Sequence, residues 1–157
     1  MGKINSSTNE RSVNGTSSAD SINNTASKVT INAAAGNDSI YSSNSTGYNS
    51  ISGGDGNDTI NNNYGKYVTI DAGDGMNYVY NYSSSNAWIT AGQHDDTIKN
   101  QYSNYSTINS GAGNDSIYNN YSSGVTINSG EGDNKIDNQY SHQHLLLRFP
   151  MTNGCHS

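Results

Sequence analysis

The chain has 157 residues, of which only 31% are hydrophobic, and its formal net charge is −6. The acidic balance argues against a nucleic-acid partner, because nucleic acid favours a basic surface. A single cysteine excludes a disulfide framework. No apolar run is long enough for membrane insertion, and no catalytic constellation is recognisable, so we expect a protein that is not an enzyme.

Residues 1–12 are polar and carry no apolar stretch of the kind found in secretory signals. We therefore expect no N-terminal signal in this segment. The segment is interpreted as a lead-in or a cap for the part of the chain that follows.

An internal repeat fills residues 13–140. One column of branched apolar residues recurs every 19 or 20 positions: Ile40, Ile60, Val79, Ile98, Ile117 and Ile136. A second column has the same intervals: Ile31, Ile51, Ile70, Ile89, Ile108 and Ile127. A fixed period of this size is typical of a solenoid, in which each coil buries its apolar side against its neighbours.

The residues around both columns predict strands. Segments such as 115–119 and 123–128 alternate β-branched or aromatic residues with small polar ones, which directs successive side chains to opposite faces. The linking stretches contain Gly, Asn, Asp and Ser, which form turns at low conformational cost. We therefore predict an all-β protein, a parallel β-solenoid (β-roll or β-helix) of about seven coils with two short strands in each.

One turn of each coil carries a recognisable motif. Residues 53–61, GGDGNDTIN, match the pattern GGxGxDxUx at every specified position, and looser copies begin at Ala33, Ala72, Ala91, Ser110 and Ser129. This series resembles the calcium-binding repeats of the RTX (hemolysin-type) family. In that family both turns of a coil of about 18 residues usually carry the pattern. Only one turn does so here, and the resemblance thus implies Ca²⁺ along one edge of the solenoid.

The chemistry of that edge also follows from its residue types. Ca²⁺ takes six to eight oxygen ligands from carboxylates and carbonyls, and a glycine-rich turn lets carbonyls converge. The turns end in a column of aspartates, Asp20, Asp38, Asp58, Asp96 and Asp115, in which Asn77 and Asn134 offer a neutral oxygen instead. Stacked coils place two such turns around one ion. The predicted metal-site residues are Asp38, Gly53, Gly54, Asp55, Gly56, Asp58, Gly73, Gly75, Asn77, Gly92, Asp96, Gly111, Gly113, Asp115, Gly130, Gly132 and Asn134.

Substitutions within this edge rank the expected sites. The interval between Asp38 and Asp58 has two carboxylates and the complete motif, so we rank it first. The interval between Asp96 and Asp115 ranks second, because His94 replaces a glycine and is expected to distort its turn. Intervals that flank a neutral asparagine should be weaker. The alternative interpretation is a series of tight Asx turns whose aspartates bond their own backbone.

The opposite turn of each coil has its own regularity. Asparagines at an unbroken interval of 19 are predicted to face inward and to bond coil to coil as a ladder: Asn62, Asn81, Asn100, Asn119 and Asn138. A row of tyrosines follows at Tyr64, Tyr102, Tyr121 and Tyr140, with Tyr82 one position out of register. These rings either stabilise the turn by stacking or present an exposed aromatic strip to a carbohydrate or a cell surface.

Residues 141–157 differ abruptly from the repeat and carry the only Pro, Phe and Cys of the chain. This tail is interpreted either as a cap over the last coil, which repeat arrays require, or as sequence unrelated to the repeat.

Three functions from different classes remain open, and the oligomeric state is not predicted. The RTX resemblance implies a calcium-stabilised bacterial module, secreted or held at the cell surface, with a structural or adhesin-type role. An ice-binding solenoid is the second, since an outward column could order water: Thr30, Ser50, Thr69, Trp88, Thr107 and Thr126. Trp88 interrupts that column and counts against ice. A self-assembling fibre subunit is the third, because open solenoid ends expose strand edges.

Overall fold

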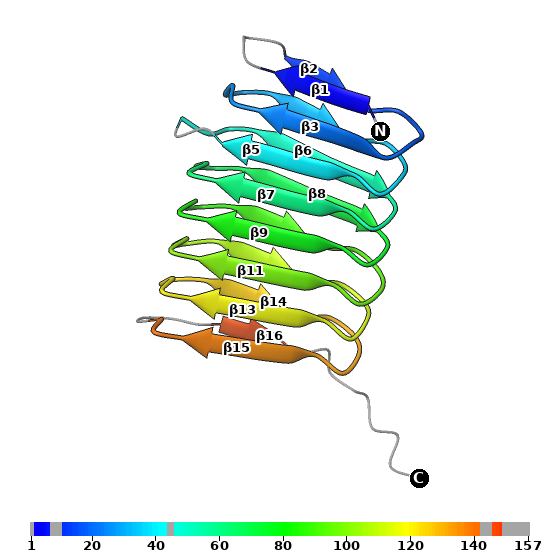
Figure 1. Ribbon diagram of the computed structural model, residues 1–157. Helices are drawn as coiled ribbons and strands as arrows, with labels where there is room; N and C mark the ends of the chain where they lie inside the picture. The colour runs from blue at the N-terminus through cyan, green and yellow to red at the C-terminus, as the bar shows by residue number, and fades with distance from the viewer. Residues whose placement is uncertain (1, 7–10, 44–45, 142–145, 149–157) are drawn as a thin grey trace.

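The computed structural model describes residues 2–6, 11–43, 46–141 and 146–148 (Figure 1). These residues form strands and turns and contain no helix, which confirms the all-β prediction. Within the same ranges, no helix is long and apolar enough to cross a membrane.

The strands form two parallel sheets. Sheet A contains β1 (Gly2–Ser6), β3 (Asp20–Asn24), β5 (Ser39–Ser43), β7 (Thr59–Asn63), β9 (Tyr78–Tyr82), β11 (Thr97–Gln101), β13 (Ser116–Asn120) and β15 (Lys135–Gln139). Sheet B contains β2 (Ser12–Asn14), β4 (Thr30–Asn32), β6 (Ser50–Asp55), β8 (Thr69–Asp74), β10 (Trp88–Thr90), β12 (Thr107–Asn109), β14 (Thr126–Asn128) and β16 (Leu146–Arg148). Each strand pairs with its counterpart in the next coil.

The chain winds from sheet A to sheet B and back once per coil (Figure 1). The pairing keeps equal positions of successive coils opposite one another, as with Ile98 and Ile117 in sheet A and Ile89 and Ile108 in sheet B. The molecule is therefore a parallel β-solenoid of about seven coils with two strands in each, as the repeat predicts.

The core lies between the two sheets. Side chains alternate between the faces of a strand, so both isoleucine columns point inward, and Ile60, Ile70, Ile98 and Ile108 are fully buried. Burying a side chain of this size stabilises the fold by about 1.5–3 kcal/mol. The register that stacks the isoleucines also places equivalent polar residues of successive coils on top of one another. Columns of polar side chains therefore form alongside the apolar columns.

Strands also reach into both end segments of the chain. β1 lies within the predicted lead-in and pairs with β3, with Ile4 opposite Ile22. β16 lies within the predicted tail and pairs with β14, with Leu147 opposite Ile127. Most of the tail lies outside the described residues. The division into residues 1–12, 13–140 and 141–157, and both interpretations of the tail, stay predictions.

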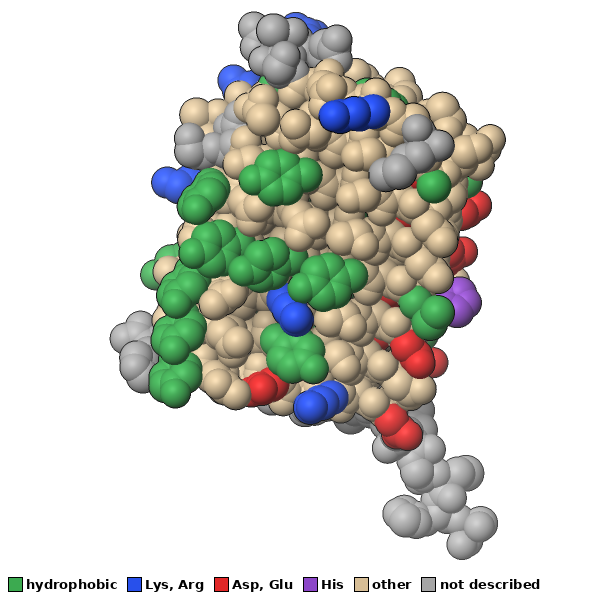
Figure 2. All heavy atoms as spheres, viewed as in Figure 1, with side chains coloured by type: hydrophobic (Ala, Val, Ile, Leu, Met, Phe, Trp, Pro, Cys, Tyr) green, Lys and Arg blue, Asp and Glu red, His purple; other side chains and the backbone are tan. Residues whose placement is uncertain are grey.

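Two kinds of turn give the solenoid two different edges. The aspartate edge comprises the segments where the chain passes from sheet B to sheet A, including the last residues of β6 and β8: 15–20, 33–38, 53–58, 72–77, 91–96, 110–115 and 129–134. The tyrosine edge comprises the segments that lead from sheet A to sheet B, such as 102–106 and 121–125. Figure 2 shows aromatic side chains gathered along one edge and acidic side chains mostly along the other.

The predicted asparagine ladder runs inside the tyrosine edge and is confirmed. The Nδ2 of Asn62 donates to the Oδ1 of Asn81 at 2.8 Å, and the links from Asn81 to Asn100 and from Asn100 to Asn119 have the same length. The amides of Asn81 and Asn100 also donate to a turn carbonyl three residues on. Each of these inner asparagines is thus both a donor and an acceptor.

The tyrosine row lies at the surface of this edge. Tyr121 stacks between Tyr102 and Tyr140, with ring centroids 5.0 and 4.8 Å apart. Tyr82, which is out of register, meets Tyr64 and Tyr102 edge-on at 5.8 Å. The expected stacking is present, yet Tyr64, Tyr102, Tyr121 and Tyr140 stay exposed. A ligand for this aromatic strip stays a prediction.

Candidate metal centre

A buried polar column runs along the aspartate edge, and we call it the inner column. It consists of Asp20, Asp38, Asp58, Asn77, Asp96, Asp115 and Asn134. Its members from Asp20 to Asp115 are only 1–3% exposed. The structure therefore brings together the carboxylates and amides that the motif spacing places in one column.

One oxygen of each side chain links neighbouring coils. The backbone N–H of Asp38 donates to the Oδ1 of Asp58 at 2.7 Å, and the N–H of Asp58 donates to the Oδ1 of Asn77 at 2.9 Å. Further along, the N–H of Asp96 donates to the Oδ1 of Asp115 at 2.9 Å. These bonds run between coils and not within a single Asx turn.

The second carboxylate oxygen has no such partner in four coils. Within the described part of the chain, the Oδ2 atoms of Asp38, Asp58, Asp96 and Asp115 are buried and lack a hydrogen-bond donor. Leaving a buried polar group unpaired costs about 1–3 kcal/mol, and more when it is charged. A proton, a buried water or a bound cation would satisfy these four atoms.

Asp20 shows what a satisfied carboxylate looks like at the end of this column. Its Oδ2 accepts hydrogen bonds from the backbone N–H of Thr16 at 2.7 Å and from the Thr16 hydroxyl at 2.9 Å. No cation is required at this position, because Thr16 already donates two hydrogen bonds to the Oδ2 of Asp20.

Asn77 reveals what surrounds the second atom of an inner-column side chain. Its Nδ2, which stands where an aspartate has Oδ2, faces the carbonyl oxygens of Gly73, Gly75 and Ala91 at 3.3, 3.0 and 3.3 Å. Two of these carbonyls belong to its own turn and the third to the next coil. The Nδ2 of Asn134 likewise faces four turn carbonyls at 2.8–3.5 Å.

The same carbonyl positions recur in the coil of Asp58, where Gly54, Gly56 and Ala72 hold them. Beside Asp58 the space next to Oδ2 is widened because residue 53 is glycine: a Cβ there would collide with the Oδ2 of Asp58 and with the carbonyl oxygen of Ala72. Both oxygens are acceptors, so no hydrogen bond can form between them. A cation in this space would contact both. The equivalent residues in the coils of Asp38, Asp96 and Asp115 are Ala33, Ala91 and Ser110, which carry a Cβ, so this extra space is particular to Asp58.

The turn conformation depends on glycine. Gly54 and Gly56 have φ values of +104° and +128°, a region that favours glycine. A Cβ on Gly56 would also collide with the carbonyl of Gly36 in the preceding coil. The other predicted glycines occupy the equivalent positions with positive φ: Gly73, Gly75, Gly92, Gly111, Gly113, Gly130 and Gly132.

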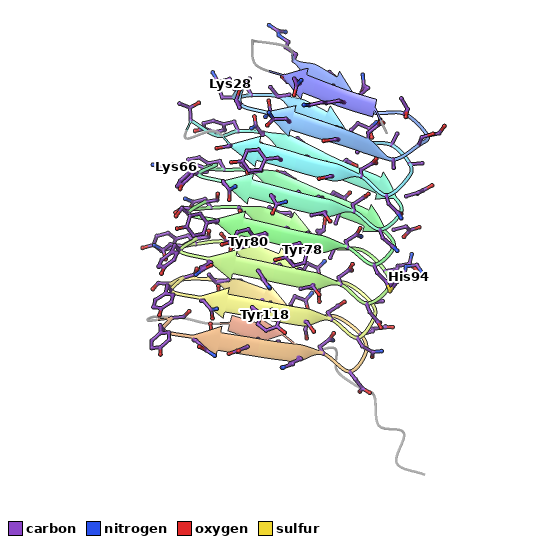
Figure 3. All side chains as sticks on the ribbon, viewed as in Figure 1. Lys28, Lys66, Tyr78, Tyr80, His94 and Tyr118 are labelled. Atoms are coloured by element: carbon purple, nitrogen blue, oxygen red, sulfur yellow. The ribbon has the colours of Figure 1, made fainter. Side chains whose placement is uncertain are left out.

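His94 occupies the position of Gly56 in its own coil and lies at the surface of the aspartate edge (Figure 3). Its φ is +84°, so the left-handed backbone is kept although the residue is not glycine. Asp96 remains buried, and its Oδ1 accepts from the N–H of Asn77 at 2.7 Å. The distortion expected from this substitution is therefore not seen.

Asp55 is the one predicted carboxylate that the structure does not place in the inner column. Its side chain is exposed on the outside of the turn. The sequence pattern alone also did not reveal a second, outer ladder: Asn57 N–H donates to the Oδ1 of Asn37 at 2.9 Å, and Asn114 N–H donates to the Oδ1 of Asp95 at 2.7 Å. Its only signal was the Asn or Asp directly before Asp38, Asp58, Asp96 and Asp115.

Burial shifts the acidity of the inner column. Desolvation raises the pKa of Asp38, raises that of Asp58 to about 6 and raises that of Asp96 to about 7. The backbone N–H bonds they accept oppose these shifts only in part. The pKa of Asp20 is lowered, chiefly because the Thr16 N–H and hydroxyl donate to it. A cation beside Asp58 or Asp96 would favour the ionised form that burial penalises.

The atoms that this edge offers to a metal ion are all oxygens. Among the described residues, no group of three His, Cys, Asp or Glu side chains lies close enough to hold a metal ion. The edge instead offers one carboxylate oxygen and several main-chain carbonyls per coil, and these hard oxygen ligands suit Ca²⁺. An aspartate Oδ2 with three carbonyls placed as they are around Asn77 would supply four of the six to eight ligands that Ca²⁺ takes.

Comparison of the chain with protein-family models, with curated proteins and with solved structures finds no match. The fold and the edge geometry therefore define the class of the protein: a parallel β-solenoid with two strands per coil and one buried acidic column. Membership of the RTX family stays a prediction from the motif.

Proposed function

We propose that this chain is a calcium-binding repeat module whose fold calcium stabilises. The observation that carries the proposal is the set of four buried Oδ2 atoms without a donor, on Asp38, Asp58, Asp96 and Asp115. Their position in the coil is the one where Asn77 faces three carbonyl oxygens. A cation is attracted to every oxygen in such a group, whereas a single proton can satisfy only one acceptor.

The ligand type favours Ca²⁺ over Mg²⁺. Ca²⁺ accepts irregular sets of carbonyl and carboxylate oxygens, whereas Mg²⁺ demands near-octahedral geometry and keeps several of its waters. Successive turns lie about one strand spacing apart, roughly 4.8 Å. This spacing lets oxygens from two turns approach one large ion.

The proposal assigns metal only to the coils of Asp38, Asp58, Asp96 and Asp115. At Asn77 and Asn134 the amide already donates to the turn carbonyls, and we infer that this NH₂ group takes the place of an ion. The expected sites therefore fall into two groups, separated by the coil of Asn77.

Calorimetric titration with calcium tests this assignment through a matched pair of variants. Asp58→Asn converts a proposed site into the type found at Asn77 and should remove one bound ion. Asn77→Asp makes the reverse change and should add one. Both residue types already occur in this column, so both variants are expected to fold.

Unchanged stoichiometry in both variants would contradict the ligand assignment. Absence of any calcium binding by the unaltered chain would contradict the proposed function as a whole. Magnesium serves as the control ion and should bind much more weakly than calcium.

The proposed setting is extracellular, secreted or at a cell surface, with a structural or adhesin-type role. Support comes from the RTX resemblance and from the long repetitive surface of the solenoid. Calcium sites of extracellular modules often have dissociation constants on the order of 10⁻⁴–10⁻³ M, a range that suits a site with one carboxylate per coil.

The ice-binding and fibre alternatives have no comparable observation in their favour. Trp88 stands 53% exposed in the threonine column of sheet B and interrupts the regular surface that ice would need. Thermal hysteresis measures ice binding directly. Light scattering against protein concentration tests for a fibre subunit.

A further inference from the structure

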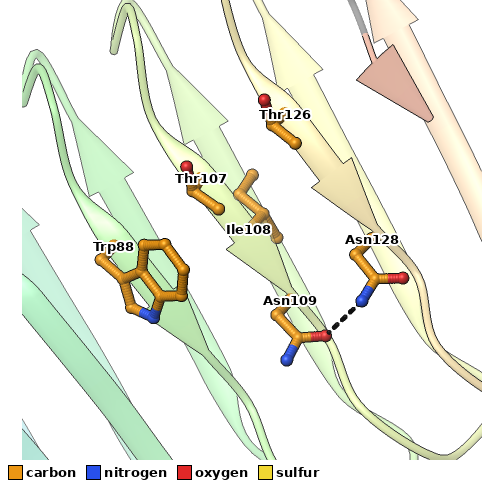
Figure 4. A pocket seen from close by; sticks show the side chains of 6 residues that line it. All are labelled: Trp88, Thr107, Ile108, Asn109, Thr126 and Asn128. Carbon is orange, nitrogen blue, oxygen red and sulfur yellow. Dashed lines mark hydrogen bonds between the residues drawn. The ribbon is translucent and has the colours of Figure 1, made fainter. Parts of the chain in front are cut away.

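A hollow lies on the outer face of sheet B beside Trp88 (Figure 4). Its volume is about 300 Å³, and its lining comes from Trp88, Thr107, Ile108, Asn109, Thr126 and Asn128. These residues belong to β10, β12 and β14, which are neighbours in sheet B, so the hollow extends over three coils. Ile108 is fully buried, and the side chains available to a ligand are therefore those of the other five residues.

Trp88 makes this part of the face different from the rest of the repeat. Its partners in the two neighbouring strands, Thr69 and Thr107, are both threonine. The indole is large and flat and remains about half exposed, at 53%. A water-exposed aromatic wall beside a hollow is a feature of ligand sites, which are largely apolar with a few placed polar groups.

The polar groups of the hollow have unused hydrogen-bonding capacity. The Nδ2 of Asn128 donates to the Oδ1 of Asn109 at 3.1 Å (Figure 4). This bond leaves the Nδ2 of Asn109 as a donor and the Oδ1 of Asn128 as an acceptor. Nothing in the described part of the chain bonds the hydroxyls of Thr107 and Thr126, and each can donate and accept.

The lining carries no charge, since tryptophan, threonine, isoleucine and asparagine do not ionise near neutral pH. Ions are therefore poor candidates for this site. A flat aromatic wall next to donors and acceptors of both kinds matches an uncharged ring that has one apolar C–H face and several hydroxyl groups.

We propose that this hollow binds a neutral pyranose sugar, with a C–H face of the ring against Trp88 and hydroxyls bonded to Asn109 and Asn128. The volume is at the small end for ligand sites, so the hollow accommodates one sugar ring. The site is open to solvent, and a dissociation constant on the order of 1 mM is expected. This function is separate from calcium binding, because the residues involved lie outside the inner column.

The chain provides its own reporter for this site, since Trp88 is its only tryptophan. Intrinsic fluorescence is measured, in excess calcium, against the methyl glycosides of glucose, galactose, mannose and N-acetylglucosamine. Sorbitol serves as the control polyol without a ring. A saturable change with at least one glycoside, and none with sorbitol, is the expected result.

Saturation-transfer NMR with the same glycosides extends the test to variants that lack the indole. Trp88→Thr gives the residue found in both neighbouring strands, so the fold should be retained while binding falls at least tenfold. Asn128→Ala should weaken binding severalfold. Tyr105→Ser removes an aromatic side chain that is 67% exposed on the tyrosine edge, and it should leave binding unchanged.

Failure of all four glycosides to give a saturable signal would overturn the proposal. An equal response to sorbitol, or undiminished transfer in Trp88→Thr, would also overturn it. If Tyr105→Ser abolished binding while Trp88→Thr did not, the sugar would bind the tyrosine edge, and the assignment to this hollow would be wrong.

Discussion

The two edges of the solenoid contain buried polar columns that stack in the same way and yet differ in how completely they are satisfied. On the tyrosine edge, Asn81 and Asn100 each accept through Oδ1 and donate through Nδ2, and only the Oδ1 of Asn62, where the asparagine run begins, lacks a donor among the described residues. On the aspartate edge, Asp58 accepts through Oδ1, while its buried Oδ2 has no donor. A stacked amide carries both a donor and an acceptor and can bond to its own kind, whereas an ionised carboxylate only accepts and needs a donor from elsewhere, as Thr16 provides for Asp20.

Removal of calcium should have the largest effect, because it acts on several carboxylates at once. A site held at a hundred times its dissociation constant contributes about 2.7 kcal/mol, so chelation should lower the melting temperature strongly. The quadruple change of Asp38, Asp58, Asp96 and Asp115 to asparagine should make the aspartate edge resemble the other edge and abolish this sensitivity. Thermal unfolding followed by circular dichroism, with chelator and with calcium, measures both. Identical melting of the unaltered chain in the two conditions would contradict the proposal.

Asn100→Asp makes the opposite change and places a carboxylate in the amide ladder. The variant loses the donor that reaches Asn119 and leaves a buried charge facing acceptors, at an expected cost of about 3–5 kcal/mol. Calcium should not restore this stability. Urea denaturation measures the loss, and Asn100→Ser is the control, because Ser42 already stands in this column. A loss of stability no greater than that of Asn100→Ser would argue against the stated difference between the amide ladder and the carboxylate column.

Acidity should affect the two edges differently when calcium is absent. Burial raises the pKa of Asp58 to about 6 and that of Asp96 to about 7, above the ordinary value of 3.8. Between the ordinary pKa of 3.8 and these raised values, the folded chain binds more protons than the unfolded chain. The free energy of unfolding should therefore fall as the pH rises from about 4 to about 7. The lowered pKa of Asp20 acts in the opposite direction, but only below this window.

Urea denaturation in chelator at about pH 5 and about pH 8 measures this slope. The double variant Asp58→Asn and Asp96→Asn should flatten it, and excess calcium should restore stability at the higher pH. Stability that increased with pH in chelator would contradict the assignment of these buried carboxylates.

The smallest effect is expected at the surface of the tyrosine edge. Tyr121→Asn removes two ring contacts worth about 0.5–1.5 kcal/mol each. Asparagine tolerates the φ of +52° found there, so the net loss should be about 1 kcal/mol. Chemical denaturation measures it, with Tyr41→Ser, an exposed ring on sheet A, as the control. A loss as large as that of Asn100→Asp would show that the surface row matters as much as the buried ladder.

His94 illustrates where prediction from residue type alone was wrong. Replacement of a turn glycine suggested a distorted coil, yet Asp96 keeps its place and its coil-to-coil bond. Bonds between coils hold the turn on both sides, for example from Ala112 N–H to the carbonyl of Gly92 at 3.0 Å. The neighbouring coils therefore maintain a backbone conformation that His94 would rarely adopt by itself.

The sequence by itself determined the solenoid, the two apolar columns, the asparagine ladder and the membership of the inner column. Coils that stack in register place equal positions on top of one another, so the 19-residue period already contains this information. Only the tertiary structure decided that Asp55 faces solvent, that Oδ2 of Asp58 lacks a donor and that Trp88 borders a hollow. These properties depend on the main-chain conformation of each turn and on atoms of the adjacent coils, and a linear pattern of residue types specifies neither.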